Sequence, residues 1–221
     1  MNEQSLSSRR TACICCNGHL RGFRRARKLA AGADMLIAAD GGAEYVQALG
    51  LKPHAVIGDM DSLREYPWPG DEDLQRVRLP SKKDKCDGEL AVEWAFEQGC
   101  DKALLLAAWG GRVDHALGNC ALLMRYPVRS ALWDDGILVM AMIEGQETTL
   151  PVPVGTAVSV ISFQPGTIIR TQGFKYELRS QPLRWATHGM SNVAETASPV
   201  VSVAKGAIVV CMEGGETWLN E

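Results

Sequence analysis

The stretch Val56-Ile57-Gly58-Asp59-Met60-Asp61-Ser62 joins an apolar run to two carboxylates that lie one residue apart. If residues 55–57 form a buried strand, Asp59 and Asp61 point the same way from its tip, because strand side chains alternate. Two close carboxylates repel each other, and a hard cation such as Mg²⁺, held by carboxylates and phosphate oxygens, removes that cost. Such a pair also occurs in solvated turns and helix caps. Whether it forms a metal site therefore has to be judged from the neighbouring motifs.

Three other segments carry acids and glycines at expected strand ends: Ala39-Asp40-Gly41-Gly42, Lys83-Asp84-Lys85-Cys86-Asp87-Gly88-Glu89 and Gly110-Gly111-Arg112-Val113-Asp114-His115. Helical segments alternate with buried apolar runs, at residues 11–16, 35–39, 55–57 and 102–109. This alternation is typical of a parallel sheet covered on both faces, in which ligands bind at the carboxyl ends of the strands. We therefore expect the polar segments to converge on one site.

The segment from Gly110 to Met124 has the pattern of a helix that begins at a ligand site. Its apolar residues recur at helical spacing and predict a core-facing stripe: Val113, Ala116, Leu117, Cys120, Ala121 and Met124. Arg112, His115 and Asn119 fall on another face at the start of the helix. A helix N-terminus favours phosphate, and an arginine adds bidentate recognition. The alternative is that His115 packs locally and Arg112 is a surface charge.

A second expected helix start carries Asp84 and Asp87, close to Lys83. Asp87 alone would be explained as an N-cap. At the same sheet edge as Asp59 and Asp61, however, these residues suit a magnesium–triphosphate site, in which the carboxylates bind the metal and Lys83 binds phosphate oxygens. Neither the P-loop pattern nor G-x-G-x-x-G occurs, which argues against those two kinds of nucleotide site.

Composition excludes several classes of protein. The 221 residues carry a net charge of -3, so no general nucleic-acid-binding surface is expected. No apolar run approaches the ~18 residues of a membrane span, and the polar residues 1–10 lack the apolar core of a signal peptide. The seven cysteines are odd in number and irregularly spaced, and Cys13 and Cys16 have no second pair with which to bind zinc. We expect reduced, buried core cysteines and a cytoplasmic protein.

After Pro127 the chain becomes rich in Val and Ile, with Gly and Pro turns between the runs. The predicted strands lie at residues 131–143, 157–163, 200–203 and 207–212. The expected fold class is α/β: an N-terminal Rossmann-like parallel sheet with helices on both faces, followed by a C-terminal all-β sandwich. We divide the chain into a disordered tail (1–10), an α/β domain (11–135) and a β-sandwich domain (136–221).

The order of these motifs resembles the thiamine pyrophosphokinase family. Ala39-Asp40-Gly41-Gly42-Ala43 resembles its ADGGA element, and Gly58-Asp59-Met60-Asp61-Ser62 resembles GD-x-DS. The segment from Lys83 to Glu89 is similar to K-D-x-T-D-x-E, with Cys86 in place of the usual Thr. The segment from Gly110 to His115, followed by Asn119, resembles the family's GGR-x-DH element and the Asn after it. In the β-rich half, Gly173-Phe174-Lys175-Tyr176 resembles a G-L-K-Y element and Gly189-Met190-Ser191-Asn192 resembles a G-x-SN element.

The resemblance implies transfer of pyrophosphate from ATP to the hydroxyl of thiamine, giving thiamine diphosphate and AMP, with Mg²⁺ as cofactor. It implies that Asp59, Asp61 and Asp87 bind the metal and that Ser191 and Asn192 contact the thiamine pyrimidine. The residues implied to shape the nucleotide site are Asp40, Gly41, Gly42, Lys83, Arg112, Asp114, His115 and Asn119. It also implies a homodimer whose sites lie at the subunit interface.

Several points stay open at the level of sequence. The residue that accepts the proton of the attacking hydroxyl is either Asp87 or Asp84, and the sequence does not decide between them. Some family members stack a tryptophan of the last strand on thiamine; this chain has none there, and neither Trp185 nor Trp218 can be assigned that role. The alternatives are a related pyrophosphokinase acting on 6-hydroxymethyl-pterin and a catalytically silent nucleotide- or thiamine-binding module.

Overall fold

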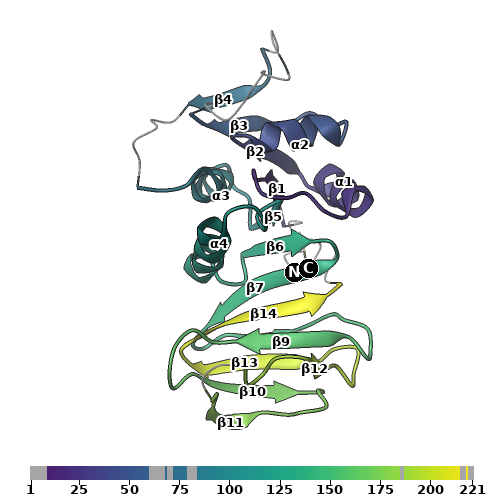
Figure 1. The fold of residues 1–221 in the computed structure, drawn as a ribbon, viewed down its shortest axis with the longest axis vertical. Helices are drawn as coiled ribbons and strands as arrows, with labels where there is room; N and C mark the ends of the chain where they lie inside the picture. Colours follow the sequence, from purple (N-terminus) through teal and green to yellow (C-terminus); the bar gives the residue numbers. More distant parts are fainter. Residues whose placement is uncertain are drawn as a thin grey trace, which may run out of the picture.

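The computed structural model describes residues 9–59, 68, 72–78, 84–184, 187–214 and 218. The described strands form two sheets (Figure 1). The larger has ten strands in the order β12-β9-β14-β7-β6-β5-β1-β2-β3-β4, and the smaller has four in the order β11-β10-β13-β8. The predicted mixed α/β fold with a further antiparallel β-sheet is thus confirmed.

One end of the large sheet is parallel and is built mostly from buried apolar runs, with one exposed strand at its edge. Its strands are β1 (Thr11–Cys15), β2 (Met35–Ala39), β3 (Ala55–Gly58), β4 (Gln75–Arg78), β5 (Lys102–Leu106) and β6 (Ser130–Asp134). Strand β1 lies at the centre, with Ile14 opposite Ile37 of β2 on one side and Leu105 of β5 on the other. Strands β1, β2, β3 and β5 are buried along their whole length because helices cover both faces.

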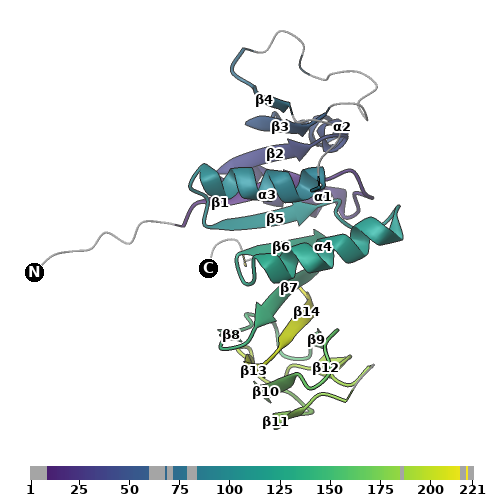
Figure 2. The same ribbon diagram turned by 90° about the vertical axis from the view of Figure 1, so that its left-hand side faces the viewer.

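Four helices cover this parallel region: α1 (Phe23–Gly32), α2 (Gly42–Ala48), α3 (Asp87–Glu97) and α4 (Val113–Arg125). Figure 2 shows α3 and α4 side by side over one face, while α1 and α2 lie over the other. Each face therefore has its own apolar core. No helix in the described part of the chain is long and apolar enough to cross a membrane.

The large sheet continues into the second half of the chain. A tight turn at Asp135 and Gly136, both with positive φ, connects β6 to the antiparallel β7 (Ile137–Ile143). The expectation of a single strand over residues 131–143 was therefore wrong, because these two residues reverse the chain. The sheet is completed by β14 (Ala207–Glu213), β9 (Ala157–Ile161) and β12 (Asn192–Val193).

The smaller sheet contains β8 (Glu147–Thr149), β10 (Ile168–Gln172), β11 (Arg179–Pro182) and β13 (Val200–Lys205). Its inward residues Ile169, Val201 and Val203 belong to the same apolar core as Val158 and Val210 of the large sheet. The two sheets thus share one core, as expected for facing β-sheets.

Two expectations about burial were wrong. Of the stripe predicted on α4, Val113 and Leu117 are 74% and 57% exposed, and Ala121 is also exposed. The buried face is instead formed by Ala116, Asn119, Cys120, Leu122 and Leu123. Asn119 can be buried because its amide donates a hydrogen bond to the carbonyl oxygen of Ala108.

The second correction concerns the cysteines. Five of the seven are buried and Cys211 is half-buried, but Cys86 is exposed. The reason is its position as the N-cap residue of α3, at the carboxyl edge of the sheet rather than beneath a helix. All seven are free thiols.

Helix α2 begins against the end of β1, and this contact generates a stability prediction. A Cβ atom on Gly42 would overlap the carbonyl oxygen of Cys15. We expect Gly42→Ala to lower the free energy of unfolding by about 1–3 kcal/mol, because backbone has to move to relieve the overlap. The matched control is Gly32→Ala at the end of α1, where a Cβ atom would meet nothing within 4 Å. Urea denaturation of both variants checks this, and equal stability would contradict it.

Candidate functional site

A cavity of about 320 Å³ lies where β1, β2 and β5 end. Residues directly after these strands line it, namely Asn17 and Gly18 after β1, Asp40 after β2, and Ala107 and Ala108 after β5. The N-terminal parts of α3 and α4, with the residues just before them, complete the lining: Cys86, Asp87, Gly88, Gly111, Arg112, His115 and Asn119. The cavity thus occupies the place at which parallel sheets bind ligands.

Gly58 shows how closely the acidic residues approach one another. A Cβ atom on Gly58 would lie 3.0 Å from Cβ of Asp40 and 3.2 Å from Oδ1 of Asp87. The φ angle of Gly58, 152°, is also one that other residues rarely adopt. Two carboxyl-bearing residues from separate segments therefore flank the backbone that leads into Asp59.

Asp40 is the most constrained of these acids. It is only 6% exposed, and its Oδ1 atom has no hydrogen-bond partner among the described residues. Its φ angle of 47° lies in the left-handed region, as does that of Ala107 on the same cavity wall. A buried oxygen without a partner and strained backbone both cost free energy, and both are characteristic of ligand sites.

The donor atoms gathered here suit a hard cation. Carboxylate oxygens of Asp40 and Asp87 lie at one cavity, and oxygen is the ligand that Mg²⁺ prefers. Two of the predicted residues, Asp61 and Lys83, fall outside the described residues, so the expected trio Asp59, Asp61 and Asp87 cannot be assembled. Within the described ranges no group of three or more His, Cys, Asp or Glu side chains is placed to hold a metal ion.

Arg112 lines the cavity, but its guanidinium group is paired with Asp114. Nη2 of Arg112 lies 2.5 Å from Oδ2 of Asp114, and Nε donates to Oδ1 at 3.1 Å. This hydrogen bonding lowers the pKa of Asp114 to about 2. Both side chains are mostly exposed, so the pair is open to solvent and to an incoming anion.

Asn119 and Cys16 fix the cavity wall. Nδ2 of Asn119 donates to the carbonyl oxygen of Ala108 at 2.6 Å, which ties α4 to the chain leaving β5. Burial raises the pKa of the Cys16 thiol well above its ordinary value, so Cys16 contributes a neutral surface. Gly41 packs beneath the side-chain amide of Asn17, and this contact joins the chain after β1 to the turn after β2.

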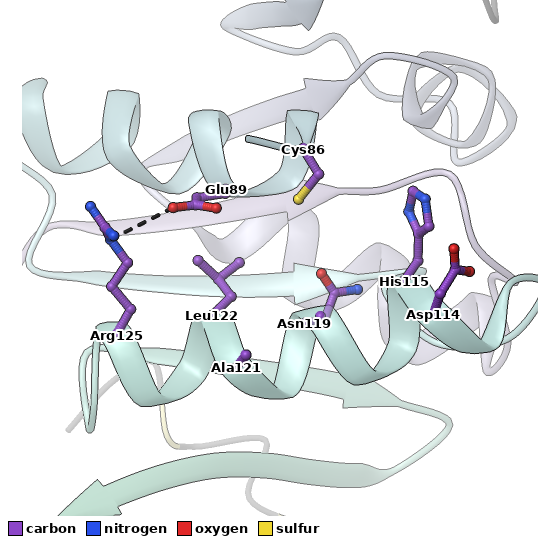
Figure 3. A pocket seen from close by; sticks show the side chains of 9 residues that line it. Cys86, Glu89, Asp114, His115, Asn119, Ala121, Leu122 and Arg125 are labelled. Carbon is purple, nitrogen blue, oxygen red and sulfur yellow. Dashed lines mark ion pairs between the residues drawn. The ribbon is translucent and has the colours of Figure 1, made fainter. Parts of the chain in front are cut away.

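A second cavity of about 480 Å³ lies between α3 and α4 (Figure 3). It shares Cys86, His115 and Asn119 with the first cavity, so the two cavities lie next to each other. Its other lining residues are Glu89, Asp114, Gly118, Ala121, Leu122 and Arg125. Nε of Arg125 lies 3.6 Å from Oε1 of Glu89, and this ion pair bridges the two helices at the end far from His115.

The structure brings together six of the predicted site residues that it describes: Asp40, Asp87, Arg112, Asp114, His115 and Asn119. Asp84 is exposed and belongs to neither cavity lining. Sequence reasoning missed Asn17, Glu89, Gly118 and Arg125 as lining residues. The signal that selected Asp40, a polar residue directly after a buried strand, also fits Asn17. The other three lie within helices and follow no strand; Glu89 ends the K-D-x-T-D-x-E element, but no role was assigned to it.

Ser191 and Asn192 lie elsewhere, at the edge strand β12. The Asn192 side chain is occupied by Tyr176: Oδ1 accepts the Tyr176 N–H at 3.1 Å, and Nδ2 donates to its carbonyl oxygen at 2.8 Å. The backbone N–H of Ser191 donates to Oγ of Ser159. Six strands separate β12 from β2, so these two residues do not line the cavity beside Asp40.

Of the two tryptophans left open, Trp185 lies outside the described residues. Trp218 is buried. Nζ of Lys102 lies 4.5 Å from the centroid of the Trp218 ring and donates a hydrogen bond to the carbonyl oxygen of Trp218 at 2.5 Å. Lys102 begins β5, at the end of the sheet opposite the cavity. Trp218 is therefore a core aromatic in this structure.

The Arg112–Asp114 pair generates a titration prediction. In Arg112→Gln the pKa of Asp114 should rise from about 2 toward its ordinary value of 3.8, because the hydrogen bonds that favour the carboxylate are lost. A lowered pKa contributes stability above the unfolded value and loses it as pH falls through the folded value, so the effect belongs to pH 2–4. Carboxyl-carbon NMR titration measures it; an unchanged Asp114 pKa would show that the pair does not form.

The chain was compared with known proteins. The family profile "Thiamin pyrophosphokinase, catalytic domain" matches residues 26–132, and "Thiamin pyrophosphokinase, vitamin B1 binding domain" matches residues 147–208. Thiamine pyrophosphokinase of Bacillus subtilis (strain 168) is 31% identical over 97 residues, which is 40% of this chain and 42% of that protein. Thiamine pyrophosphokinase 2 of Arabidopsis thaliana is 28% identical over 157 residues, 61% and 55% of the two chains. The matches thus span about half the length of these curated relatives.

Solved structures agree over more of the chain. The thiamin pyrophosphokinase crystal structure from Geobacillus thermodenitrificans has a TM-score of 0.76 at 26% identity, covering 92% of this chain and 97% of that one. The Bacillus subtilis crystal structure has the same fold, with a TM-score of 0.80 at 24% identity over 93% and 99% of the chains. With both domain profiles matched in order, the chain belongs to the thiamine pyrophosphokinase family.

Proposed function

We propose that this chain transfers the terminal diphosphate of ATP to the hydroxyl of thiamine, giving thiamine diphosphate and AMP. The observation that carries the proposal is the match of both family profiles, the catalytic and the vitamin B1 binding, along one chain. The cavity at the ends of β1, β2 and β5 supports it, because the buried Oδ1 atom of Asp40 has no hydrogen-bond partner there and would be satisfied by a cation, such as the metal of Mg-ATP, or by a hydrogen-bond donor.

We assign the ATP phosphates to this cavity, with Mg²⁺ held by Asp59, Asp61 and Asp87. When bound, Mg²⁺ supplies neutralisation of the charge on the phosphate oxygens. Gly58 supports this assignment, since its surroundings bring Asp87 to the end of the strand that precedes Asp59. The residues assigned to the nucleotide site are Asp40, Gly41, Gly42, Lys83, Arg112, Asp114, His115 and Asn119.

Each of the side chains at the cavity then has its own role in the reaction. Arg112 exchanges its pairing with Asp114 for phosphate oxygens, since both partners are exposed. Asn119 holds the wall at Ala108 in place so that the phosphates meet a fixed surface. Asp87, or Asp84 on the exposed chain before α3, accepts the proton of the attacking hydroxyl. Diphosphate transfer of this kind depends on positioning and charge neutralisation.

We propose that the β-rich half binds thiamine at Ser191 and Asn192 and that the enzyme is a homodimer with shared sites. Seven strand-to-strand steps lead from β12 to β2, which at the usual spacing is roughly 30 Å. One thiamine molecule cannot contact both places in one chain, so a second subunit has to bring its β12 to the cavity. The two family profiles, at residues 26–132 and 147–208, support a division into a Rossmann-like domain (11–135) and a β-sandwich domain (136–221), although one sheet runs through both.

The proposed reaction is tested by incubating the full chain with Mg-ATP and one acceptor at a time. We expect AMP and a diphosphorylated product in equal amounts with thiamine, and neither with 6-hydroxymethyl-pterin. AMP formation with the pterin instead would assign the enzyme to the other acceptor. Binding of ATP or thiamine without any AMP would make the chain a silent binding module.

Shared sites are tested by mixing two inactive variants. Asp87→Asn removes a carboxylate from the cavity, and Ser191→Lys places a cation against the cationic thiamine; each alone should lose nearly all turnover. Co-expressed, they should recover about a quarter of wild-type turnover, because half of randomly formed dimers carry one intact site of two.

Glu44→Gln is the matched control for the first variant. Glu44 is likewise an acid in the first turn of a helix, α2, but it is exposed and lies outside the cavity lining. It should keep wild-type turnover. If both inactive variants fold and the mixture gains no activity, each site is contained within one chain.

A further inference from the structure

The first turn of α3 carries Asp87, to which we assign the metal, yet its local sequence is a poor start for a helix. Cys86 occupies the N-cap position, and no side-chain hydrogen bond caps the helix. A thiol is a weak hydrogen-bond acceptor, whereas Ser, Thr, Asp and Asn are the usual caps. Gly88 follows within the first turn, where glycine adds conformational freedom. We therefore expect another contact to hold this turn in place.

Lys85, which directly precedes the N-cap residue, makes such a contact. Its ammonium group donates to Oε1 of Glu93 at 2.7 Å and to Oε2 at 2.6 Å, over a separation of eight residues. Glu93 lies in the second turn of α3, so the lysine side chain runs along the helix that it precedes. The contact fixes the direction in which the chain enters α3, and with it the backbone of Cys86 and Asp87.

Glu93 is itself fixed by the end of α4. Its Oε1 atom accepts a hydrogen bond from the Tyr126 hydroxyl at 2.9 Å, and Nη2 of Arg125 lies 3.4 Å away. The hydrogen bonds from Lys85, and then the one from Tyr126, lower the pKa of Glu93. Both members of the ion pair are partly shielded from solvent, with side chains 38% exposed for Lys85 and 21% for Glu93. Such a network holds a geometry better than an isolated surface pair does.

We propose that Glu93 is a positioning residue for the diphosphate transfer: through Lys85 it holds the start of α3 so that Asp87 stays at the cavity. The inference rests on the proposed function in giving Asp87 a role toward Mg-ATP. Lys85 is placed to act on the chain rather than on phosphate, because it lines neither cavity and its ammonium group is directed at Glu93. The ion pair takes the place of the cap that Cys86, standing where the related motif has Thr, does not supply.

The test removes the contact while keeping the length of both side chains. Glu93→Gln removes the negative charge, Lys85→Met removes the ammonium group, and the double variant completes a cycle. The matched control is Asp34→Asn. Asp34 is likewise a carboxylate that accepts two hydrogen bonds, from the N–H and the hydroxyl of Thr11, but it lies at the end of the sheet opposite the cavity.

Hydrogen exchange of the ligand-free chain comes first, because it depends on no reaction. The Leu90 amide donates to the carbonyl oxygen of Cys86 at 3.1 Å, so its exchange reports opening of the first turn of α3. We expect exchange about tenfold faster in Glu93→Gln and in Lys85→Met, with no further increase in the double variant, because both changes remove the same contact. The Asp34→Asn control should exchange at the wild-type rate at Leu90.

Calorimetry with Mg-ATP, in the absence of thiamine, then measures what the loosened helix start does to the site. We expect the dissociation constant to rise about fivefold in Glu93→Gln and Lys85→Met, because Asp87 is no longer held in one position. KM for thiamine should stay at its wild-type value. Lys85→Met keeps the test informative if Glu93→Gln does not fold, since the lysine side chain is the more exposed of the two.

Restoring a cap provides a rescue that a purely structural role of the ion pair would not predict. Cys86→Thr, added to Glu93→Gln, supplies a hydroxyl at the N-cap with Glu89 three residues later, which is the arrangement of a capping box. Exchange at Leu90 and affinity for Mg-ATP should both return toward wild-type values. Cys86→Ala in the same background is the matched control and should rescue neither, because alanine cannot cap a helix.

Unchanged exchange at Leu90 in folded Glu93→Gln and Lys85→Met would overturn the inference. Faster exchange with unaltered affinity for Mg-ATP would overturn it too, because the pair would then stabilise the helix without serving the site. Failure of Cys86→Thr to rescue would refute the substitution of the ion pair for the cap, and a wild-type chain that does not bind Mg-ATP would leave nothing to position. The reaction is judged separately: a chain that shows these effects on exchange and binding but forms no AMP with thiamine would refute the reaction and support the positioning role.

Discussion

The close approach of Asp40, Gly58 and Asp87 is the constraint on which the site depends. Parallel pairing of β2 and β3 brings Asp40 beside the end of β3, where its N–H donates to the carbonyl oxygen of Ile57. Only a glycine at residue 58 leaves space for both acids, since a Cβ atom there would lie 3.0 Å from Asp40. The fold therefore places carboxylates where electrostatics disfavours them, and a cation or a ligand donor offsets that cost.

The parallel sheet could be predicted from the sequence because its signal is local. Residues 35–39 form β2 as predicted, since a short apolar run between helical segments has few other ways to be buried. The convergence of Asp40, Asp87 and Arg112 follows from the same topology. Asn17 also follows a buried strand directly, but sequence reasoning did not select it as a site residue.

The parts that could not be predicted depend on long-range packing. The apolar periodicity of α4 gives the spacing of a stripe but not which side meets the sheet. Asn119 reaches the Ala108 carbonyl, so its own face becomes the buried one and Leu117 turns outward. Strand β11 consists of exposed residues, so no hydrophobic alternation marks it. The second cavity is lined by side chains from both α3 and α4, and such a pairing of two helices has no signature in either helix alone.

Asn192 belongs to the G-x-SN motif, yet most of its hydrogen bonds hold the protein's own backbone. A carboxamide offers two N–H donors and one oxygen with two lone pairs. Here the oxygen accepts from the N–H groups of Tyr176 and Val193, and one N–H donates to the Tyr176 carbonyl oxygen. One N–H remains for a ligand, on a side chain that is almost fully buried. The main effect of Asn192 is thus to hold the backbone of Tyr176 next to Ser191.

Ser191 differs from Asn192 in its exposure. Its backbone is left-handed, with φ of 53°, and its side chain is exposed. Ser191 therefore has more freedom than Asn192 to meet an acceptor molecule, and the shape around it is set by backbone hydrogen bonds.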